Sequence, residues 1–212
     1  MIDKLYYFLL KFLSKPQEKG LPSSGIWQEL VRKTVFSLIK NEGGSILEIG
    51  CGEGLFLKKI KKNFKEVVGI DISIEQLQNA RKICKNFNFI QADAIKLPFK
   101  DKIFDTIVCI NFFINLPTGI DISAVLSEIK RVSKKKAKFI FEIRNSKSPL
   151  INFKYRTAKY YDKTISYLRA FCYEDFKKKL ELLNFKISKR IDLGFPKGNF
   201  SPIIVIEAIN ND

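Results

Sequence analysis

The chain of 212 residues contains no histidine, and its four cysteines stand far apart in the sequence. Histidine is the most common general base and zinc ligand, so its absence, together with isolated cysteines, leads us to expect no catalytic metal site. The spacing of Cys51, Cys84, Cys109 and Cys172 matches no metal-ligand pattern, and we therefore expect a reducing, cytoplasmic location. No apolar run is long enough for a membrane-spanning helix.

Acidic residues are scarce relative to basic ones, and the formal net charge is +16. Such a charge can attract nucleic acid or an anionic membrane. The excess is nearly all lysine, whereas arginine is the residue suited to bidentate phosphate binding. A genome biased toward A and T also enriches any protein in lysine. A nucleic-acid partner therefore stays open but is not favoured.

The most informative stretch is Glu48-x-Gly50-x-Gly52-x-Gly54, which follows the apolar residues Ile46 and Leu47. This pattern predicts a buried parallel strand, a tight turn and the start of a helix. Glycines let the backbone contact a cofactor, and free N–H groups at the start of a helix favour polar or anionic ligand groups. A dinucleotide site would need glycine or alanine where Leu55 stands, and Glu48 would repel a pyrophosphate. The motif thus argues against NAD.

Strands and helices are expected to alternate along most of the chain. The predicted helices span 27–38, 55–62, 74–84 (with a Ser73–Gln76 capping box), 123–132 and 173–183, and the predicted strands span 46–49, 67–70, 87–92, 104–110, 137–143, 186–192 and 203–209. Such alternation predicts an α/β fold with a doubly wound, mostly parallel sheet. The last two strands flank a Gly/Pro loop and predict an antiparallel hairpin at one edge of the sheet.

Three of the predicted strands end in acidic residues, Glu48, Asp71 and Asp93. In an open α/β sheet the ligand lies outside the carboxyl ends of the strands. A carboxylate at the second strand end can accept both hydroxyls of a ribose, and one at the third can accept from the amino group of adenine. Each acidic residue alone is equally typical of a helix cap or a solvated turn. Their joint placement favours a nucleoside site.

Four segments resemble the successive motifs of class I S-adenosylmethionine-dependent methyltransferases, particularly the small-molecule branch. They are Ile46-Leu-Glu-Ile-Gly-Cys-Gly-Glu-Gly54, Val68-Gly-Ile-Asp71-Ile-Ser, Gln91-Ala-Asp93-Ala and Phe104-Asp-Thr-Ile-Val, and the resemblance extends over roughly residues 45–210. It implies S-adenosylmethionine as the cofactor and a Rossmann-like, seven-stranded sheet whose last strand is antiparallel, with helices on both faces.

The resemblance also implies roles for individual residues. Glu48 and the backbone at Gly50, Cys51 and Gly52 would hold the methionine part, Asp71 the ribose, Ile72 and Asp93 with Ala94 the adenine, and the Cys109 backbone the methionine end. Asn115 stands where many small-molecule members have histidine, so the catalytic base is unassigned. The candidates for a catalytic role are Asn111, Asn115 and Tyr160. Asn184 replaces a glycine before Phe185, at a position suited to the left-handed conformation.

The chain is expected to comprise an N-terminal helical cap, residues 1–44, and a methyltransferase domain, residues 45–212, with a substrate-side insertion at 145–172. The insertion lacks strong periodicity, and its candidate acceptor contacts are Tyr155, Arg156, Tyr160 and Arg169. Ordinary packing is the alternative role for each tyrosine. Residues 1–13 suit a short helix that either contacts a membrane surface or docks over the active site.

The leading hypothesis is a cytoplasmic methyltransferase for a small-molecule or lipid-like acceptor. One alternative is an RNA methyltransferase that uses the basic surface. Strand four would then end in Asn/Asp-Pro-Pro-aromatic or Pro-Cys, and Cys109-Ile-Asn111-Phe has neither. The other alternative is a non-catalytic regulator that binds S-adenosylmethionine. The acceptor, the methylated atom and the oligomeric state stay undetermined by the sequence.

Overall fold

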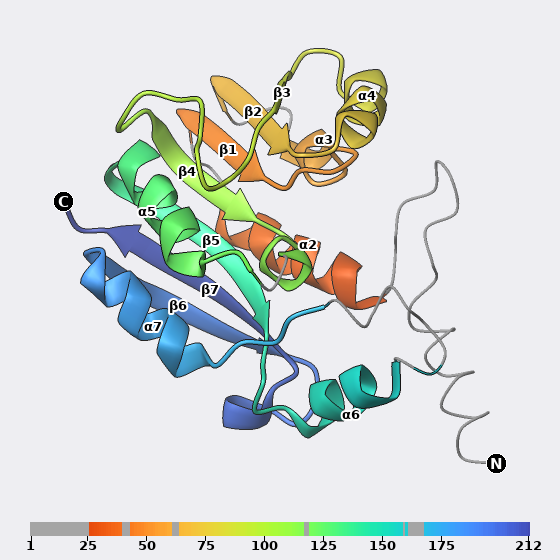
Figure 1. Cartoon of the computed structure of the whole chain (residues 1–212). Coiled ribbons are helices and arrows are strands. Elements are labelled where there is room, and N and C mark those ends of the chain that lie inside the picture. Colours follow the sequence, from red (N-terminus) through yellow and green to blue (C-terminus); the bar gives the residue numbers. More distant parts are fainter. Residues whose placement is uncertain (1–25, 40–42, 61–63, 117–118, 159, 161–167) are drawn as a thin grey trace.

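A computed structural model describes residues 26–39, 43–60, 64–116, 119–158, 160 and 168–212. One seven-stranded sheet runs through these residues in the order β3-β2-β1-β4-β5-β7-β6 (Figure 1). Its strands are β1 (Ser45–Ile49), β2 (Glu66–Asp71), β3 (Asn88–Gln91), β4 (Phe104–Cys109), β5 (Ser133–Arg144), β6 (Phe185–Leu193) and β7 (Ile203–Asn210). Only β7 runs antiparallel to its neighbours, β5 and β6. The predicted doubly wound sheet with an antiparallel last strand is confirmed.

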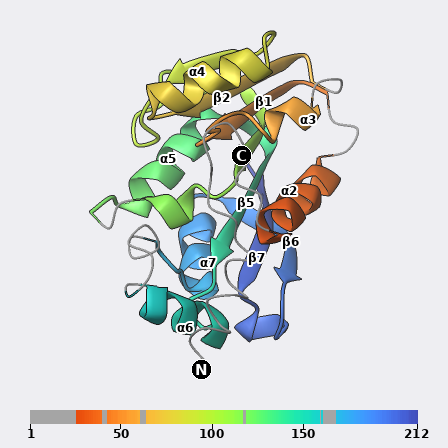
Figure 2. The ribbon, with the colours of Figure 1, turned by 90° about the vertical axis from the view of Figure 1, so that its right-hand side faces the viewer.

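Helices cover both faces of this sheet (Figure 2). They are α2 (Ile26–Leu38), α3 (Leu57–Ile60), α4 (Ile74–Ile83), α5 (Ile122–Val132), α6 (Pro149–Ala158) and α7 (Tyr173–Leu182), with short 3-10 turns η1 (Phe113–Asn115) and η3 (Gly198–Phe200). The apolar sides of α5 and α7 pack on one face, and those of α2, α3 and α4 on the other. Ser73 caps α4 by accepting from the Gln76 N–H at 3.3 Å, which is half of the predicted capping box, and the Ser73 N–H donates to Asp71 instead of to the Gln76 side chain.

A cluster of phenylalanine rings fills the core on the α5–α7 face. The Phe113 ring of η1 lies at its centre, with ring centroids 5.0 Å from Phe176 and 5.5 Å from Phe141. Edge-to-face pairs of this kind are favourable beyond their buried area. Because Phe113 is fully buried here, the residues on either side of it in the chain are held at fixed positions. These neighbours include Phe112 and Asn115, which face the site described below.

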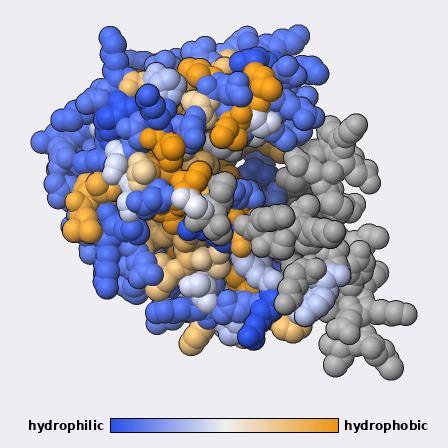
Figure 3. Space-filling view, viewed as in Figure 1, coloured by the Kyte–Doolittle hydropathy of each residue, from blue (hydrophilic) through white to orange (hydrophobic). Residues whose placement is uncertain are grey.

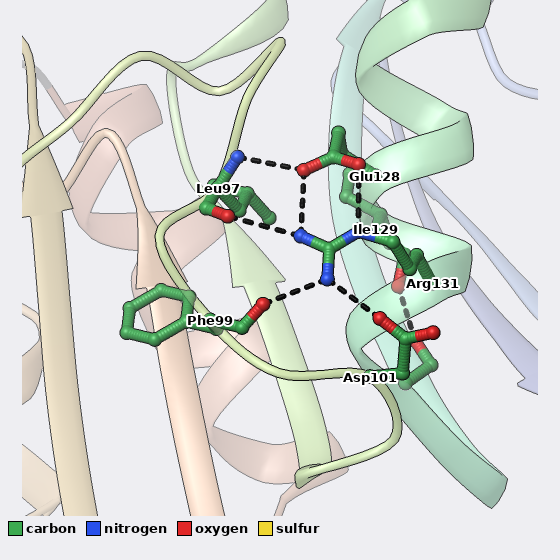
Figure 4. Close-up of polar contacts among 7 residues, drawn as sticks. Leu97, Phe99, Asp101, Glu128, Ile129 and Arg131 are labelled. Atoms are coloured by element: carbon green, nitrogen blue, oxygen red, sulfur yellow. Dashed lines mark hydrogen bonds and ion pairs between the residues drawn. The ribbon is translucent and has the colours of Figure 1, made fainter.

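Arg131 of α5 anchors the loop that connects β3 to β4 (Figure 4). Its guanidinium donates to the carbonyl oxygens of Leu97 and Phe99, at 2.9 and 2.7 Å, and to the Asp101 carboxylate at 2.8 Å. Glu128, one helical turn earlier, accepts from Arg131 and from the Leu97 N–H. The loop directly follows Asp93 and Ala94, so this network fixes one wall of the strand-end region.

Two expectations from the sequence differ from the structure. β5 begins at Ser133, four residues before the predicted start, and Lys136 takes a left-handed φ of 62° within it. Residues 149–158, where we expected no regular element, form helix α6. The left-handed conformation expected for Asn184 is confirmed, with φ 58°. The helix predicted at residues 1–13 lies outside the described residues, so the cap at 1–44 stays a prediction.

The face seen in Figure 3 is largely hydrophilic at its margins, and apolar side chains show mainly toward its middle. Among the described helices, none is both long enough and apolar enough to cross a membrane.

Candidate functional site

A cleft of about 320 Å³ opens at the carboxyl ends of β1, β2, β3 and β4. Strand ends and the residues that follow them supply its walls. It is lined by Ile49, Gly50, Ile70, Asp71, Ile72, Ala92, Asp93, Ala94, Asn111, Phe112, Asn115, Leu116 and Ile120. The structure therefore brings together seven of the residues that the sequence nominated, namely Gly50, Asp71, Ile72, Asp93, Ala94, Asn111 and Asn115.

The glycine turn after β1 uses its own N–H groups to hold itself in place. Gly50 and Cys51 both donate to the Ile70 carbonyl oxygen, at 2.8 and 2.9 Å. Gly52 donates to the Asp71 carboxylate at 2.9 Å, and Gly54 donates to the Cys51 carbonyl at 2.9 Å. These four N–H groups are therefore already used, whereas the free N–H groups expected from the sequence belong to the start of the next helix, α3. At the turn itself, carbonyl oxygens are left to contact a ligand, and they suit a cationic group.

Space for that ligand lies beside Gly52. A Cβ at this position would meet nothing closer than the Gln76 Oε1 atom at 3.7 Å, and φ is 50°. Gly50 is different, because a Cβ there would lie 2.8 Å from the Phe112 ring. The turn thus packs tightly against the segment after β4 at Gly50 and leaves room at Gly52. This cradle fits the methionine part of the cofactor that the resemblance implies.

Glu48 is a buried carboxylate with one oxygen unpaired. Glu48 is only 3% exposed, and its Oε2 atom has no hydrogen-bond partner in the described structure. Burial raises the pKa of Glu48 well above its ordinary value, Arg32 opposes the shift, and Asp71 and Glu142 add to it. A buried, unpaired carboxylate is costly, and a ligand ammonium would satisfy it. Glu48 therefore fits the role that the sequence gave it.

Asp71 and Asp93 shape the other end of the cleft. Asp71 accepts from Gly52 N–H and Ser73 N–H, both at 2.9 Å, so each of its oxygens is fixed and keeps a further lone pair. Asp93 accepts from the Ile95 N–H at 3.1 Å. Ile72 borders the cleft with 69% of its surface exposed, so its side chain is accessible to a ligand there. These residues fit a ribose with a base beside it.

Asn111, two residues after the end of β4, is held by three hydrogen bonds. Its backbone adopts a left-handed φ of 54°, and its N–H donates to Glu142 at 2.6 Å. Arg144 donates to its side-chain oxygen at 3.1 Å, and Asn115 donates to its carbonyl oxygen at 2.6 Å. Glu142 and Arg144, at the end of β5, were not nominated from the sequence. The signal that could have found them is a carboxylate inside the apolar run 139–143 with an arginine directly after it.

The cysteine side chains nominated near the site face the core. Cys109 is fully buried and Cys51 is 6% exposed, and burial raises the pKa of both thiols. Neither lines the cleft, nor do Glu48 and Gly52, whose places are described above. The roles predicted for Cys51 and Cys109 involve the backbone alone, and these stay predictions.

The candidate acceptor contacts lie in three places. Tyr155 and Arg156 of α6 line a separate hollow with Asn152, and burial raises the pKa of Tyr155 to about 12, so its hydroxyl stays a donor at neutral pH. Tyr160 is 80% exposed. Arg169 donates through its N–H to Ile114 at 2.9 Å and through Nη1 to the carbonyl of Ile120, a cleft residue. The structure thus brings Arg169 to the rim of the cleft and not Tyr155 or Arg156.

Comparison with known proteins gives a consistent result. Residues 47–141 match the family model described as a methyltransferase domain. A demethylmenaquinone methyltransferase of Thermotoga maritima is 37% identical over 94 residues, which is 44% of this chain and 40% of that protein. A phosphatidylethanolamine N-methyltransferase of Cereibacter sphaeroides is 33% identical over 119 residues, 53% of this chain and 57% of that protein. The chain spans about half the length of the curated relatives it matches.

A solved structure shares the fold. Magnesium protoporphyrin IX methyltransferase from Synechocystis, determined with bound S-adenosylhomocysteine, superposes with a TM-score of 0.66 at 18% identity. The superposition covers 98% of this chain and 94% of that one. At this identity the likeness concerns the fold, and it extends well beyond the matched residues 47–141.

Proposed function

Because the chain belongs to the class I methyltransferases, whose cofactor is S-adenosylmethionine, we propose that it transfers a methyl group to a small-molecule or lipid-like acceptor. The observation that carries the proposal is the buried, unpaired Glu48 carboxylate beside an open glycine cradle. A methionine ammonium is the cation that would pair with this carboxylate, while Asp71 receives the ribose hydroxyls.

The protein's contribution to the reaction is chiefly placement. S-adenosylmethionine, when bound, supplies an electrophilic methyl group. Holding an acceptor in line with such a group can contribute on the order of 7–11 kcal/mol without a dedicated base. Asn115 lines the cleft and is the candidate to orient the acceptor. A carboxylate or a water molecule would take the proton of a hydroxyl acceptor.

The nature of the acceptor is inferred from the relatives and from the insertion. The two relatives named above are called after a quinone and a phospholipid, which are both lipid-like. The hollow lined by Tyr155 and Arg156 offers an aromatic wall and a cation beyond the cleft. We place the acceptor between this hollow and the cleft. The proposed membrane contact through residues 1–13 would serve the same acceptor class.

The test is methyl transfer from S-adenosylmethionine carrying a labelled methyl group. Two acceptors are offered separately, reduced demethylmenaquinone in detergent and phosphatidylethanolamine in vesicles, with product identified by mass spectrometry. We expect methylation of one acceptor above the level of an Asp71→Ala control. Tight cofactor binding without transfer to either acceptor would instead support a cofactor-binding regulator.

The charge of +16 favours one second candidate, an RNA methyltransferase. Its test is the same labelled cofactor with a ribosomal RNA transcript as the acceptor. Labelled RNA at physiological salt, with neither lipid-like acceptor methylated, would promote this candidate over the first.

A further inference from the structure

None of the residues assigned to the cofactor above donates a hydrogen bond to the carboxylate of its methionine part. It is an anion, and anions in proteins are held by N–H groups or cationic side chains. The N–H groups of Gly50, Cys51, Gly52 and Gly54 are all used within the protein. Among the residues that line the cleft, the polar side chains are Asp71, Asp93, Asn111 and Asn115. The hydrogen-bond donor for the carboxylate must therefore be one of these four side chains or a residue that does not line the cleft.

Only the two asparagines in this set can donate. Asn115 already gives its Nδ2 group to the Asn111 carbonyl oxygen at 2.6 Å. Asn111 accepts from Arg144 through Oδ1, which fixes the orientation of its amide and leaves Nδ2 on the other side. Within the described part of the chain, Nδ2 of Asn111 donates to no hydrogen-bond acceptor in the structure. Asn111 therefore presents two N–H donors at the cleft.

The location of Asn111 also suits the methionine end. Phe112, the next residue, packs against Gly50, so this segment faces the glycine turn directly. Glu142, which accepts the Asn111 N–H, lies close enough to Glu48 for their charges to interact. An ammonium on Glu48 and a carboxylate on Asn111 would thus belong to one amino-acid group.

We propose that the Asn111 amide binds the carboxylate of S-adenosylmethionine, and that Glu142 and Arg144 are positioning residues that fix this amide. The inference rests on the proposed function, because it assumes that the cofactor occupies the cleft. Asn111 then becomes a specificity-determining residue. It lets the protein distinguish S-adenosylmethionine from decarboxylated S-adenosylmethionine, which differs only in lacking that carboxylate.

The experiment measures the affinity of both ligands by calorimetry. Asn111→Gly is the main variant, because glycine adopts a φ of 54° without strain and removes the amide. We expect the wild-type protein to bind S-adenosylmethionine more tightly than the decarboxylated ligand. Asn111→Gly should lower the affinity for S-adenosylmethionine alone by roughly 10- to 100-fold, because a charge-assisted hydrogen bond is lost. Affinity for the decarboxylated ligand should change less than about threefold.

The positioning role is tested in the same assay. Glu142→Ala should reproduce the selective loss, whereas Glu142→Gln should restore most of the selectivity, because the glutamine oxygen still accepts the Asn111 N–H. Glu207→Ala is the matched control. Glu207 is also buried with an unpaired Oε2, but it lies on β7 and does not line the cleft. It should lower stability and leave the ratio of affinities unchanged.

The following results would overturn the inference, one of its parts, or the proposed function on which it rests. Equal weakening of both ligands in Asn111→Gly would show that the residue supports the cleft without contacting the carboxylate. An unchanged ratio in Glu142→Ala, or the same change in Glu207→Ala, would remove the positioning role. A wild-type protein that binds neither ligand would refute the proposed function itself, whereas tight and equal binding of both would refute only this inference.

Discussion

Asp71 is the residue on which cofactor affinity should depend most directly. Its two oxygens accept from Gly52 and Ser73 and keep lone pairs for ribose hydroxyls. Asp71→Ala should therefore lower the affinity for S-adenosylhomocysteine by roughly tenfold or more, since hydrogen bonds to charged groups are worth roughly 1.5–3 kcal/mol each. Titration calorimetry measures the loss. The milder Asp71→Asn, which keeps one oxygen acceptor, should lie between the alanine variant and the wild type, and unchanged affinity in both would contradict the site.

The raised pKa of Glu48 predicts that cofactor binding releases a proton. Because burial raises its pKa well above the ordinary value of 4.5, the folded protein holds the carboxyl protonated to a higher pH than the unfolded chain does. Its ionisation therefore lowers stability as pH rises from the ordinary pKa through the folded pKa. A ligand ammonium favours the ionised form and expels the proton within that window. Calorimetry across a pH series above the ordinary pKa, in two buffers of different ionisation enthalpy at each pH, measures the release.

The control for this experiment is Glu48→Gln, which has no proton to lose. We expect the buffer dependence to vanish in this variant while weak binding persists. A buffer dependence equal to that of the wild type would assign the proton to another group, such as Glu142, whose pKa burial also raises.

Sequence reasoning located the cleft residues whose positions follow from strand ends. Asp71 and Asp93 could be found because alternating strands and helices bring the carboxyl ends to one edge. The hydrogen-bond partners of the turn N–H groups could not be predicted from the sequence. The Ile70 carbonyl accepts from the Gly50 N–H only because β1 and β2 pair in the folded sheet. Glu142 and Arg144 were missed for a similar reason, since a strand position carries no sign of what lies beside it in the folded sheet.

The Arg131 side chain connects helix α5 to the loop before β4, and the stability of this part of the fold should depend on it. Arg131→Met should lower the free energy of unfolding by roughly 1–2 kcal/mol, because four partners lose a charged donor in a partly exposed network. Lys177→Met is the control, since it breaks only an exposed pair with Glu181 at 3.9 Å, worth roughly 0.3–0.5 kcal/mol. Urea unfolding compares the two. Equal losses would mean that the network adds nothing beyond a surface pair.

Helix α6 and the residue just beyond it carry the acceptor prediction. Arg156→Ala or Tyr160→Ala should reduce methyl transfer while affinity for S-adenosylhomocysteine stays within about threefold, because neither residue lines the cofactor cleft. Steady-state kinetics with the acceptor that proves active, together with calorimetry, separates the two effects. Normal transfer in both variants would place acceptor recognition elsewhere.

The elements themselves were largely predictable, and the exceptions have physical causes. Most predicted boundaries lie within a few residues of the observed ones, because the apolar runs of the strands are bounded by glycine, proline or polar residues. Residues 149–158 gave no helical signal since the helix is amphipathic only in part, with Ile151 buried while Leu150 and Phe153 are 41% and 48% exposed. The start of β5 was masked by the lysines at 134–136, which resembled a turn and continue the strand.

At the scale of the whole molecule, the two halves of the sheet have different tasks. The half formed by β3, β2, β1 and β4 ends in the cleft, and the match to the methyltransferase domain model covers this half and most of β5. The half formed by β5, β7 and β6 contributes Glu142 and Arg144 to the site, and the insertion lies between β5 and β6. The residues expected to bind the cofactor therefore lie mainly on the first half, and most of the proposed acceptor contacts lie on the insertion.

The net charge of +16 yields the last prediction, which concerns the molecule as a whole. Lysines spread over a surface attract phosphates without shaping a groove, so nucleic-acid binding should be weak and independent of sequence. Each phosphate neutralised releases counterions, and the logarithm of the affinity should therefore fall steeply and linearly with the logarithm of the salt concentration. Fluorescence anisotropy with two unrelated RNA oligonucleotides across a salt series measures this. A sequence preference that persists at physiological salt would show a shaped RNA site and favour the second candidate function over the first.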